Sequence, residues 1–112
     1  MKTSELTREA LNWAVAICQN VECDENNKPI WFDNDGSFAS RSEYTPSADW
    51  AQGGLIIERE GIEITRGGAY AEHFWKATGS SRAAYGPTPL IAGMRCYVAS
   101  KLGDEVEIPE QL

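Results

Sequence analysis

The sequence lacks most of the residue patterns that build common active sites. It holds one histidine and three cysteines, Cys18, Cys23 and Cys96, and no C-x-x-C pair. This cysteine usage speaks against a disulfide framework and a structural zinc site, and it favours a reducing compartment. The sequence also has no G-x-S-x-G, Walker A or G-x-G-x-x-G motif. We therefore expect a protein without enzymatic activity, bound metal or cofactor.

Positive charge and long hydrophobic runs are scarce as well. Ten Lys and Arg residues stand against 17 Asp and Glu residues, which gives a net charge of −7. Because nucleic-acid binding draws its affinity from clustered cations, we expect no direct nucleic-acid partner. No apolar run approaches the roughly 20 residues that a membrane span needs, and the N-terminus shows no signal core. These features predict a cytoplasmic protein without a membrane partner.

What is present suits one globular domain over residues 1–112, with 42% hydrophobic and 24% charged residues. Its clearest element is a helix over Pro89–Leu102, which Thr88 caps and Gly103 ends. Large apolar side chains line one face of this helix and small ones the other, so we expect both faces to contact protein. The small face consists of Ala92, Gly93, Cys96, Ala99 and Ser100.

An N-terminal helix is predicted to begin near Thr7, with Leu6 and Leu11 placed to form a hydrophobic staple. Asn12 is expected to point to solvent. A row of small residues on the helix is expected to pack on the small face of the C-terminal helix. The row consists of Ala10, Ala14 and Cys18.

A middle helix is predicted from a cap at Ser47 to a stop at Gly61. Inside it, Gly53 and Gly54 each cost about 1 kcal/mol relative to alanine, so we expect a close neighbour there. The preceding residues 20–44 are polar and turn-rich. They carry a predicted short strand at Pro29–Phe32 and a turn at Asn34–Gly36.

After the middle helix the hydrophobic period changes from that of a helix to that of strands. Three strands are predicted, over residues 62–66, 71–77 and 81–85. The order of elements predicts an α+β fold in which a small antiparallel sheet of about three strands packs with N-terminal, middle and C-terminal helices. We expect an arrangement similar to an α/β/α sandwich.

Aromatic and polar residues gather at the predicted start of the middle helix, where free backbone amides favour an anion. Arg95 borders the apolar face of the C-terminal helix and brings a cation. The candidate ligand-binding or partner-binding residues are Tyr44, Asp49, Trp50, Gln52, Trp75 and Arg95. In the alternative interpretation, Arg95 pairs with Asp49 and the cluster serves packing.

Reactive side chains offer two weaker hypotheses. A dyad of His73 and Cys96 requires Cys96 to lie on the sheet side of its helix, whereas the helical pattern places it on the small, buried face. A zinc site of Cys18, Cys23, Cys96 and His73 has suitable ligand types without the usual paired spacing. We therefore favour a buried, inert thiol and a strand histidine.

The longest distinctive block runs from Gly86 to Pro109 and contains GPTPL followed by MRCYVASKLGDEV. The chain resembles the NinX-like family of small lambdoid phage and prophage proteins in this block and in shorter ones. The shorter matches are Leu11, Trp13, Ala14, Val15 and Ala16; Ser47, Asp49 to Gly54 and Ile56 to Glu58; and Trp75 and Ala77. Leu55 and Gly93 stand where this family suggests proline and alanine. The resemblance implies a phage protein related to α/β/α-sandwich domains, and it brings no established activity, cofactor or site residues.

These features favour a phage accessory protein that binds a host or phage protein without catalysis. The alternative is a small-molecule binder that holds a nucleotide-like ligand between the Trp50 helix start and Arg95. An enzyme centred on His73 and Cys96 is a third hypothesis. The small face of the C-terminal helix also suits a homodimer, since it permits close approach by any helix.

Overall fold

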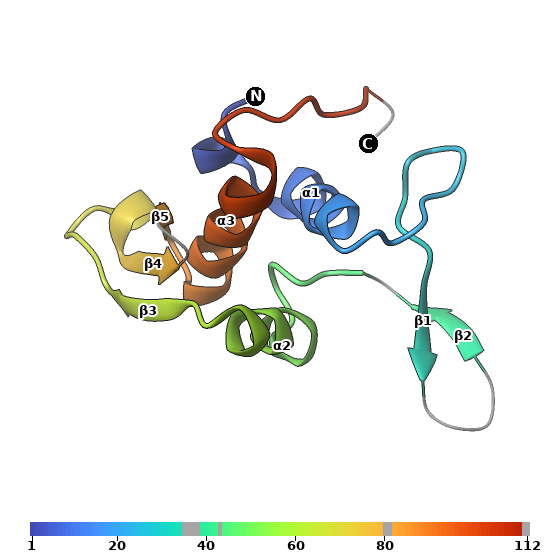
Figure 1. Cartoon of the computed structure of the whole chain (residues 1–112), viewed down its shortest axis with the longest axis horizontal. Coiled ribbons are helices and arrows are strands. Elements are labelled where there is room, and N and C mark those ends of the chain that lie inside the picture. The colour runs from blue at the N-terminus through green and yellow to red at the C-terminus, as the bar shows by residue number, and fades with distance from the viewer. Residues whose placement is uncertain (35–38, 43, 80–81, 111–112) are drawn as a thin grey trace.

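The longest helix, α3 (Pro89–Leu102), forms the middle layer of the protein (Figure 1). The computed structural model describes residues 1–34, 39–42, 44–79 and 82–110. On one side of α3 lie two helices, and on the other lies a three-stranded antiparallel sheet of order β3-β4-β5. The elements are α1 (Arg8–Cys18), α2 (Trp50–Glu60), β3 (Glu63–Arg66), β4 (Trp75–Gly79) and β5 (Arg82–Gly86).

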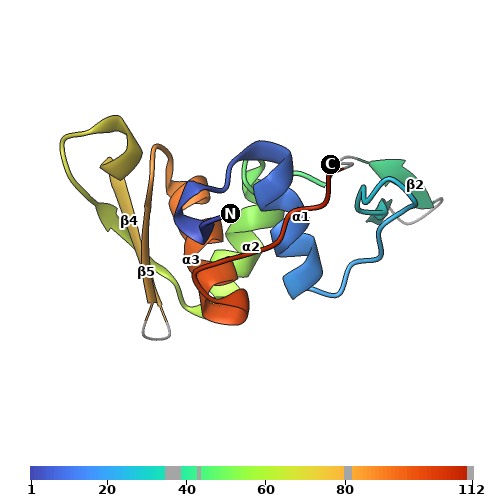
Figure 2. The ribbon, with the colours of Figure 1, turned by 90° about the horizontal axis from the view of Figure 1, so that it is seen from above.

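The predicted α+β class, with three helices and a three-stranded antiparallel sheet, is confirmed. The order of layers differs from the expected sandwich, in which the sheet would lie between helices. Figure 2 shows the sheet first, then α3, then α1 and α2. Among the described residues, α3 is the long helix that packs on the sheet. One face of the sheet therefore remains free of helices in the described part of the chain.

Helix α3 begins and ends where the sequence predicts. The Thr88 hydroxyl oxygen accepts a hydrogen bond from the Ile91 amide at 3.1 Å, and Pro89 occupies the first turn. At the other end the Gly103 amide donates to the Ala99 carbonyl at 3.0 Å. Nearly every residue from Leu90 to Ala99 is buried, so the expected contact of both faces with protein is confirmed.

The two faces of α3 contact different layers. Its large residues, among them Met94 and Tyr97, share a core with Ala14 of α1. Its small residues Ala92 and Cys96 pack instead on alanines of the sheet. The prediction that the small row of α1 meets the small face of α3 is therefore wrong, because the sheet fills that face. The surface on which a homodimer was expected is thus covered within the chain.

Two of the three strands in the sheet, β3 and β4, are shorter than the sequence suggests. The predicted strand 71–77 is wrong at its start, because Ala71–His73 forms a single 3-10 turn, η2, and β4 begins at Trp75. In the antiparallel register Ile64 pairs with Ala77, which pairs with Ala84. These residues line the face that α3 covers. The predicted third strand is confirmed as β5, although Ser81 lies outside the described residues.

The polar segment before α2 contains a separate two-stranded ribbon at one end of the molecule (Figure 1). Its strands are β1 (Trp31–Asn34) and β2 (Ala39–Ser42). The strand predicted at Pro29–Phe32 overlaps β1 in two residues, and β2 was not predicted. The turn predicted at Asn34–Gly36 lies mostly outside the described residues.

Helix α2 ends at Gly61, as predicted, with φ of 66°. The close neighbour expected at its glycines is observed at Gly53, whereas the nearest atoms to Gly54 belong to Trp50 of α2 itself. A Cβ atom at Gly53 would collide with the Pro46 carbonyl oxygen and lie 2.8 Å from Leu90 Cδ2 of α3. Glycine at this position therefore allows the loop before α2, α2 itself and α3 to pack together.

The N-terminal segment runs beside the end of α3 and is fixed there by the chain that follows α3. The Met1 ammonium donates to the Val106 carbonyl at 2.9 Å, and the Thr3 amide donates to the Asp104 carbonyl at 2.9 Å. Residues Thr3–Glu5 form a 3-10 turn, η1, and Leu6 enters the core. This placement sets the N-terminal segment opposite β5.

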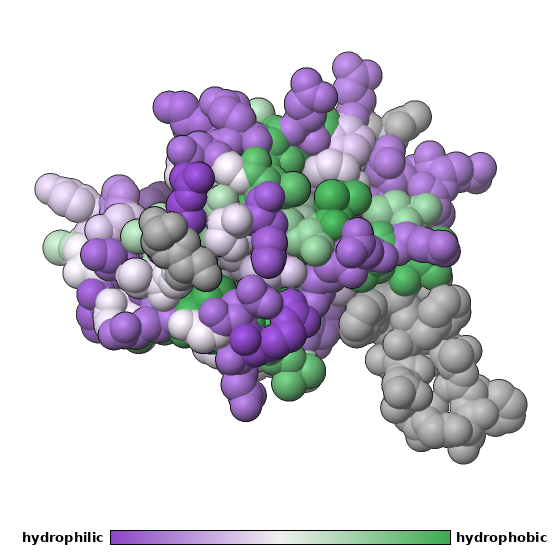
Figure 3. Space-filling model, viewed as in Figure 1, coloured by the Kyte–Doolittle hydropathy of each residue, from purple (hydrophilic) through white to green (hydrophobic). Residues whose placement is uncertain are grey.

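Hydrophilic residues surround small hydrophobic patches on the face shown in Figure 3, as the net charge of −7 leads one to expect. In the part of the chain that the structure describes, no helix has the length and apolar character needed to cross a bilayer.

Candidate functional site

The structure separates the residues proposed as one site. Arg95 does not pair with Asp49, so that prediction is wrong: the ionic partner of Arg95 is Glu72, with Nη1 3.3 Å from Oε2. The cavity that Arg95 lines includes no residue of α2. Leu90 contacts the start of α2, and Arg95 lies five positions later, about 140° further around the helix. The candidates at the start of α2 therefore lie apart from Arg95.

At the start of α2 the polar groups bond to one another. Asp49 is the helix cap, with Oδ1 accepting from the Ala51 amide at 2.9 Å and Oδ2 accepting from Gln52 Nε2 at 3.1 Å. The Gln52 side-chain oxygen accepts from the Thr45 amide at 2.9 Å. The positive end of the helix already holds a carboxylate, and a ligand anion there would be repelled by it.

Ser47 does not cap α2, contrary to the prediction. Its amide and hydroxyl both donate to Asn12 Oδ1, at 3.0 Å and 2.8 Å, and both residues are buried. The expectation that Asn12 points to solvent is wrong for the same reason. A buried amide oxygen with two donors joins α1 to the loop before α2, so these residues stabilise packing.

The aromatic candidates lie in three different environments. Tyr44 is buried, its hydroxyl bonds to Gln19, and burial raises the pKa of that hydroxyl above its usual value. Trp50 is 56% exposed on α2. Trp75 lies on β4 with the Arg66 guanidinium carbon 5.0 Å from its ring centre. They do not converge on one cavity.

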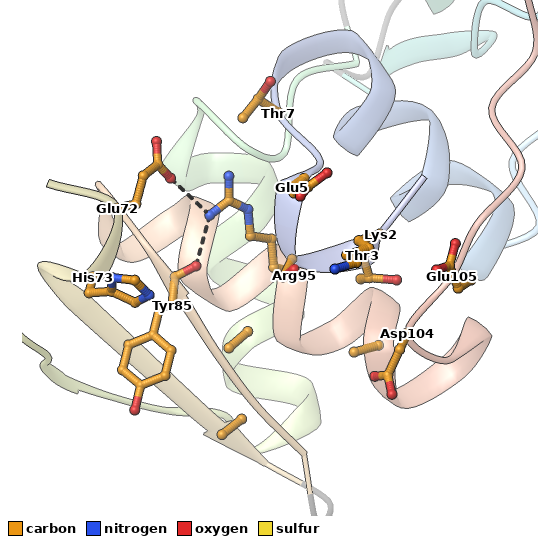
Figure 4. Close-up of a pocket in the computed structure, with 14 residues that line it drawn as sticks. Lys2, Thr3, Glu5, Thr7, Glu72, His73, Tyr85, Arg95, Asp104 and Glu105 are labelled. Carbon is orange, nitrogen blue, oxygen red and sulfur yellow. Dashed lines mark hydrogen bonds and ion pairs between the residues drawn. The ribbon is translucent and has the colours of Figure 1, made fainter.

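Arg95 is held in the interior by three groups from distant parts of the chain. Its side chain is 3% exposed. Its Nε donates to the Leu6 carbonyl at 2.9 Å, and Nη1 donates to the Tyr85 carbonyl at 2.9 Å and contacts Glu72 (Figure 4). A buried guanidinium requires such partners, since an unpaired buried charge is costly.

The second terminal nitrogen of Arg95, Nη2, has no partner among the described residues. Those residues contain no fully buried side-chain nitrogen or oxygen without a partner, so Nη2 remains accessible. Figure 4 shows it pointing between Glu72 and Thr7. It therefore faces a groove of about 580 Å³ between β5 and the N-terminal segment. The groove is lined by Lys2, Thr3, Ser4, Glu5, Thr7, Glu72, His73, Ala83, Ala84, Tyr85, Arg95, Ala99, Asp104 and Glu105.

Strand β5 borders this groove with its outer edge, on which no other described strand pairs. The Gly67 amide bonds to the Phe74 carbonyl at 2.8 Å, so in the alternating antiparallel ladder Lys76 and Thr78 bond to β3. The intervening residues of β4 bond to β5 through their partners Arg82, Ala84 and Gly86. The backbone groups of Ala83 and Tyr85 consequently point outward from the sheet. Among them, the Tyr85 carbonyl accepts the hydrogen bond from Arg95 Nη1.

Charged residues at the rim of the groove pair with one another. Arg82 lies 2.9 Å from Asp104, and the N-terminal ammonium lies 3.7 Å from Glu105. These pairs are largely exposed and contribute little to stability. They reduce the repulsion that the acidic rim would exert on an incoming anion.

His73 and Cys96 lie at opposite ends of the sheet. The His73 ring packs edge-on against Tyr85, with centres 5.0 Å apart, whereas the Cys96 thiol donates to the Arg82 carbonyl at 3.6 Å. Cys96 does lie on the sheet side of α3, contrary to our expectation, but β4 separates the two residues by about 13 Å. Burial raises the pKa of the Cys96 thiol. The dyad is therefore not formed.

The sequence pattern indicates Arg95 as a candidate, but it does not indicate Leu6, Glu72, Ala83 or Tyr85 as its neighbours. The one signal for a special position is that Arg95 is the only charged residue between Pro89 and Ser100. Its partners come from three separate segments that no local pattern connects.

Comparison with known proteins places the chain in a phage family. None of the curated proteins matches it. The family described as "Bacteriophage P22, NinX" matches residues 2–101, which include the N-terminal segment, the sheet and nearly all of α3. The match confirms the resemblance seen in the sequence. The chain therefore belongs to the bacteriophage P22 NinX family.

Proposed function

We propose that this phage protein is an accessory protein that binds a host or phage protein without catalysing a reaction, through the groove beside β5. The observation that carries this proposal is the exposed edge of β5 along the groove. An unpaired strand edge is a template on which another chain adds its own backbone.

The strand edge in the groove supports a protein partner over a small molecule. Backbone groups spaced along a strand edge match the repeating groups of an extended chain. The lining combines three alanines and Tyr85 with ten polar or charged residues, and Ala83, Ala84 and Tyr85 of β5 run along it. The nucleotide-like alternative required Arg95 beside the start of α2, and Asp49 already occupies that helix end.

Affinity capture tests this function. Tagged protein is incubated with lysate of phage-infected host cells, and the eluate is examined for proteins and for extracted small molecules. We expect one host or phage protein that excess untagged protein displaces. An eluate that holds a displaceable metabolite and no displaceable protein would contradict the proposal.

A further inference from the structure

We infer that the groove receives the C-terminal end of the protein partner, which adds to β5 as a short parallel strand and places its terminal carboxylate between the Tyr85 amide and Arg95 Nη2. This inference rests on the protein-binding function proposed above, and it names the segment that binds.

The free edge of β5 offers three backbone groups in sequence: the Ala83 amide, the Ala83 carbonyl and the Tyr85 amide. A parallel strand matches this order. One of its carbonyl groups accepts from the Ala83 amide, and the amide of the residue two positions later donates to the Ala83 carbonyl. The carbonyl of that second residue then reaches the Tyr85 amide.

The added strand ends at this point because the next backbone group of β5 is occupied. The Tyr85 carbonyl already accepts from Arg95 Nη1 at 2.9 Å. A longer strand would bring another amide against the guanidinium. A chain that terminates there instead presents a carboxylate, which accepts from the Tyr85 amide and from Nη2 in a charge-assisted bond.

The opposite strand direction fits the site less well. An antiparallel segment that began at Tyr85 would bring its terminal ammonium to the Arg95 guanidinium, and two cations repel. The parallel direction brings opposite charges together. The arginine is also fixed in place by Leu6 and Tyr85, so binding orders no further side chain there.

Glu72 is a competing anion at the site. Its side chain is 65% exposed and contacts Nη1 at 3.3 Å. A partner carboxylate on Nη2 would be repelled by it. Replacement of Glu72 by glutamine should therefore tighten binding by about two- to fivefold, the range expected for an exposed charge pair.

Random eight-residue peptides provide the test. One library displays them with free C-termini, and a second displays the same peptides followed by a constant domain. We expect enrichment from the first library alone. Synthetic copies of the enriched peptides should lose at least about tenfold in affinity when the terminal carboxylate is amidated.

Two variants at one position test the role of the strand edge. Ala83→Pro removes the outward amide and leaves the ladder to β4 intact, since proline is tolerated at sheet edges. Ala83→Ser retains the amide and serves as the matched control. We expect Ala83→Pro to bind peptide at least about tenfold more weakly than Ala83→Ser, with melting temperatures confirming that both variants fold.

The outcomes separate this inference from the proposed function. Failure to enrich peptides with free C-termini would overturn it, as would selected peptides that tolerate both amidation and Ala83→Pro. A lysate partner that Ala83→Pro still captures would uphold the function and overturn the strand-addition site. Peptides that bind as expected without any lysate partner would leave the site standing and contradict the function.

Discussion

The start of α2 and the groove beside β5 both gather polar and aromatic side chains, yet their hydrogen bonding differs. At the start of α2 the polar groups of Asp49, Gln52 and Ser47 find partners within the protein. In the groove, Nη2 of Arg95 and three backbone groups of β5 have no partner among the residues that the structure describes. The residue types alone would suggest a binding site in both regions. The polar groups that lack a partner indicate that the groove is the candidate site and that the start of α2 is a packing contact.

Arg95→Met should have the largest effect on stability. The substitution removes the donors that satisfy the Leu6 and Tyr85 carbonyls, and we expect it to lower the free energy of unfolding by about 2–4 kcal/mol. Urea denaturation measures this loss. The control Glu72→Gln removes the exposed partner alone and should change stability by about 0.5 kcal/mol or less. Equal effects of both variants would show that Arg95 does not connect these segments.

Asn12→Ala should have the second-largest effect on stability. It should affect only the packing at the start of α2. It leaves the amide and hydroxyl of Ser47 without their common acceptor, at a cost of about 1–3 kcal/mol. Urea denaturation again gives the loss, and peptide affinity at the groove should not change. A folded Asn12→Ala protein with weakened peptide binding would contradict the separation of the two regions.

Asp49→Ala should destabilise the protein by about 1 kcal/mol through loss of the helix cap. Asp49→Asn is the matched control, since asparagine also caps helices and should retain most of the stability. Thermal unfolding of the two variants gives the comparison. A nucleotide-dependent rise in melting temperature that either variant abolishes would instead support a ligand site at this helix end.

Trp50→Ala should have the smallest effect. The side chain is 56% exposed, so its removal should change the free energy of unfolding by about 0.5 kcal/mol or less. A loss above about 2 kcal/mol, measured by urea denaturation, would show that Trp50 belongs to the core.

Local signals were enough to predict both ends of α3, the C-terminal end of α2 and the α+β class. The bounds of α3 follow from Thr88, Pro89 and Gly103, which act on backbone groups a few residues away. Strand β2 was missed because its sequence, ASRS, shows no hydrophobic alternation. Ser47 was misassigned because its true partner, Asn12, lies 35 residues earlier.

The groove could not be predicted from the sequence for a related reason. Arg95 bonds to Leu6, which is 89 residues away, and to Tyr85 on a strand whose free edge depends on the order of the sheet. Neither sheet order nor register is encoded in a local pattern. Periodicity indicates which residues are buried, whereas it does not show which backbone groups stay unpaired.

Parallel captures with two variants test whether the partner binds at the edge of β5. Tagged wild-type, Ala83→Pro and Trp50→Ala proteins are incubated with the same infected-host lysate, and the captured partner is quantified. We predict that Ala83→Pro loses the partner and that Trp50→Ala retains it, because the contact lies at the β5 edge. Retention by Ala83→Pro together with loss by Trp50→Ala would contradict it and would place the contact at the start of α2.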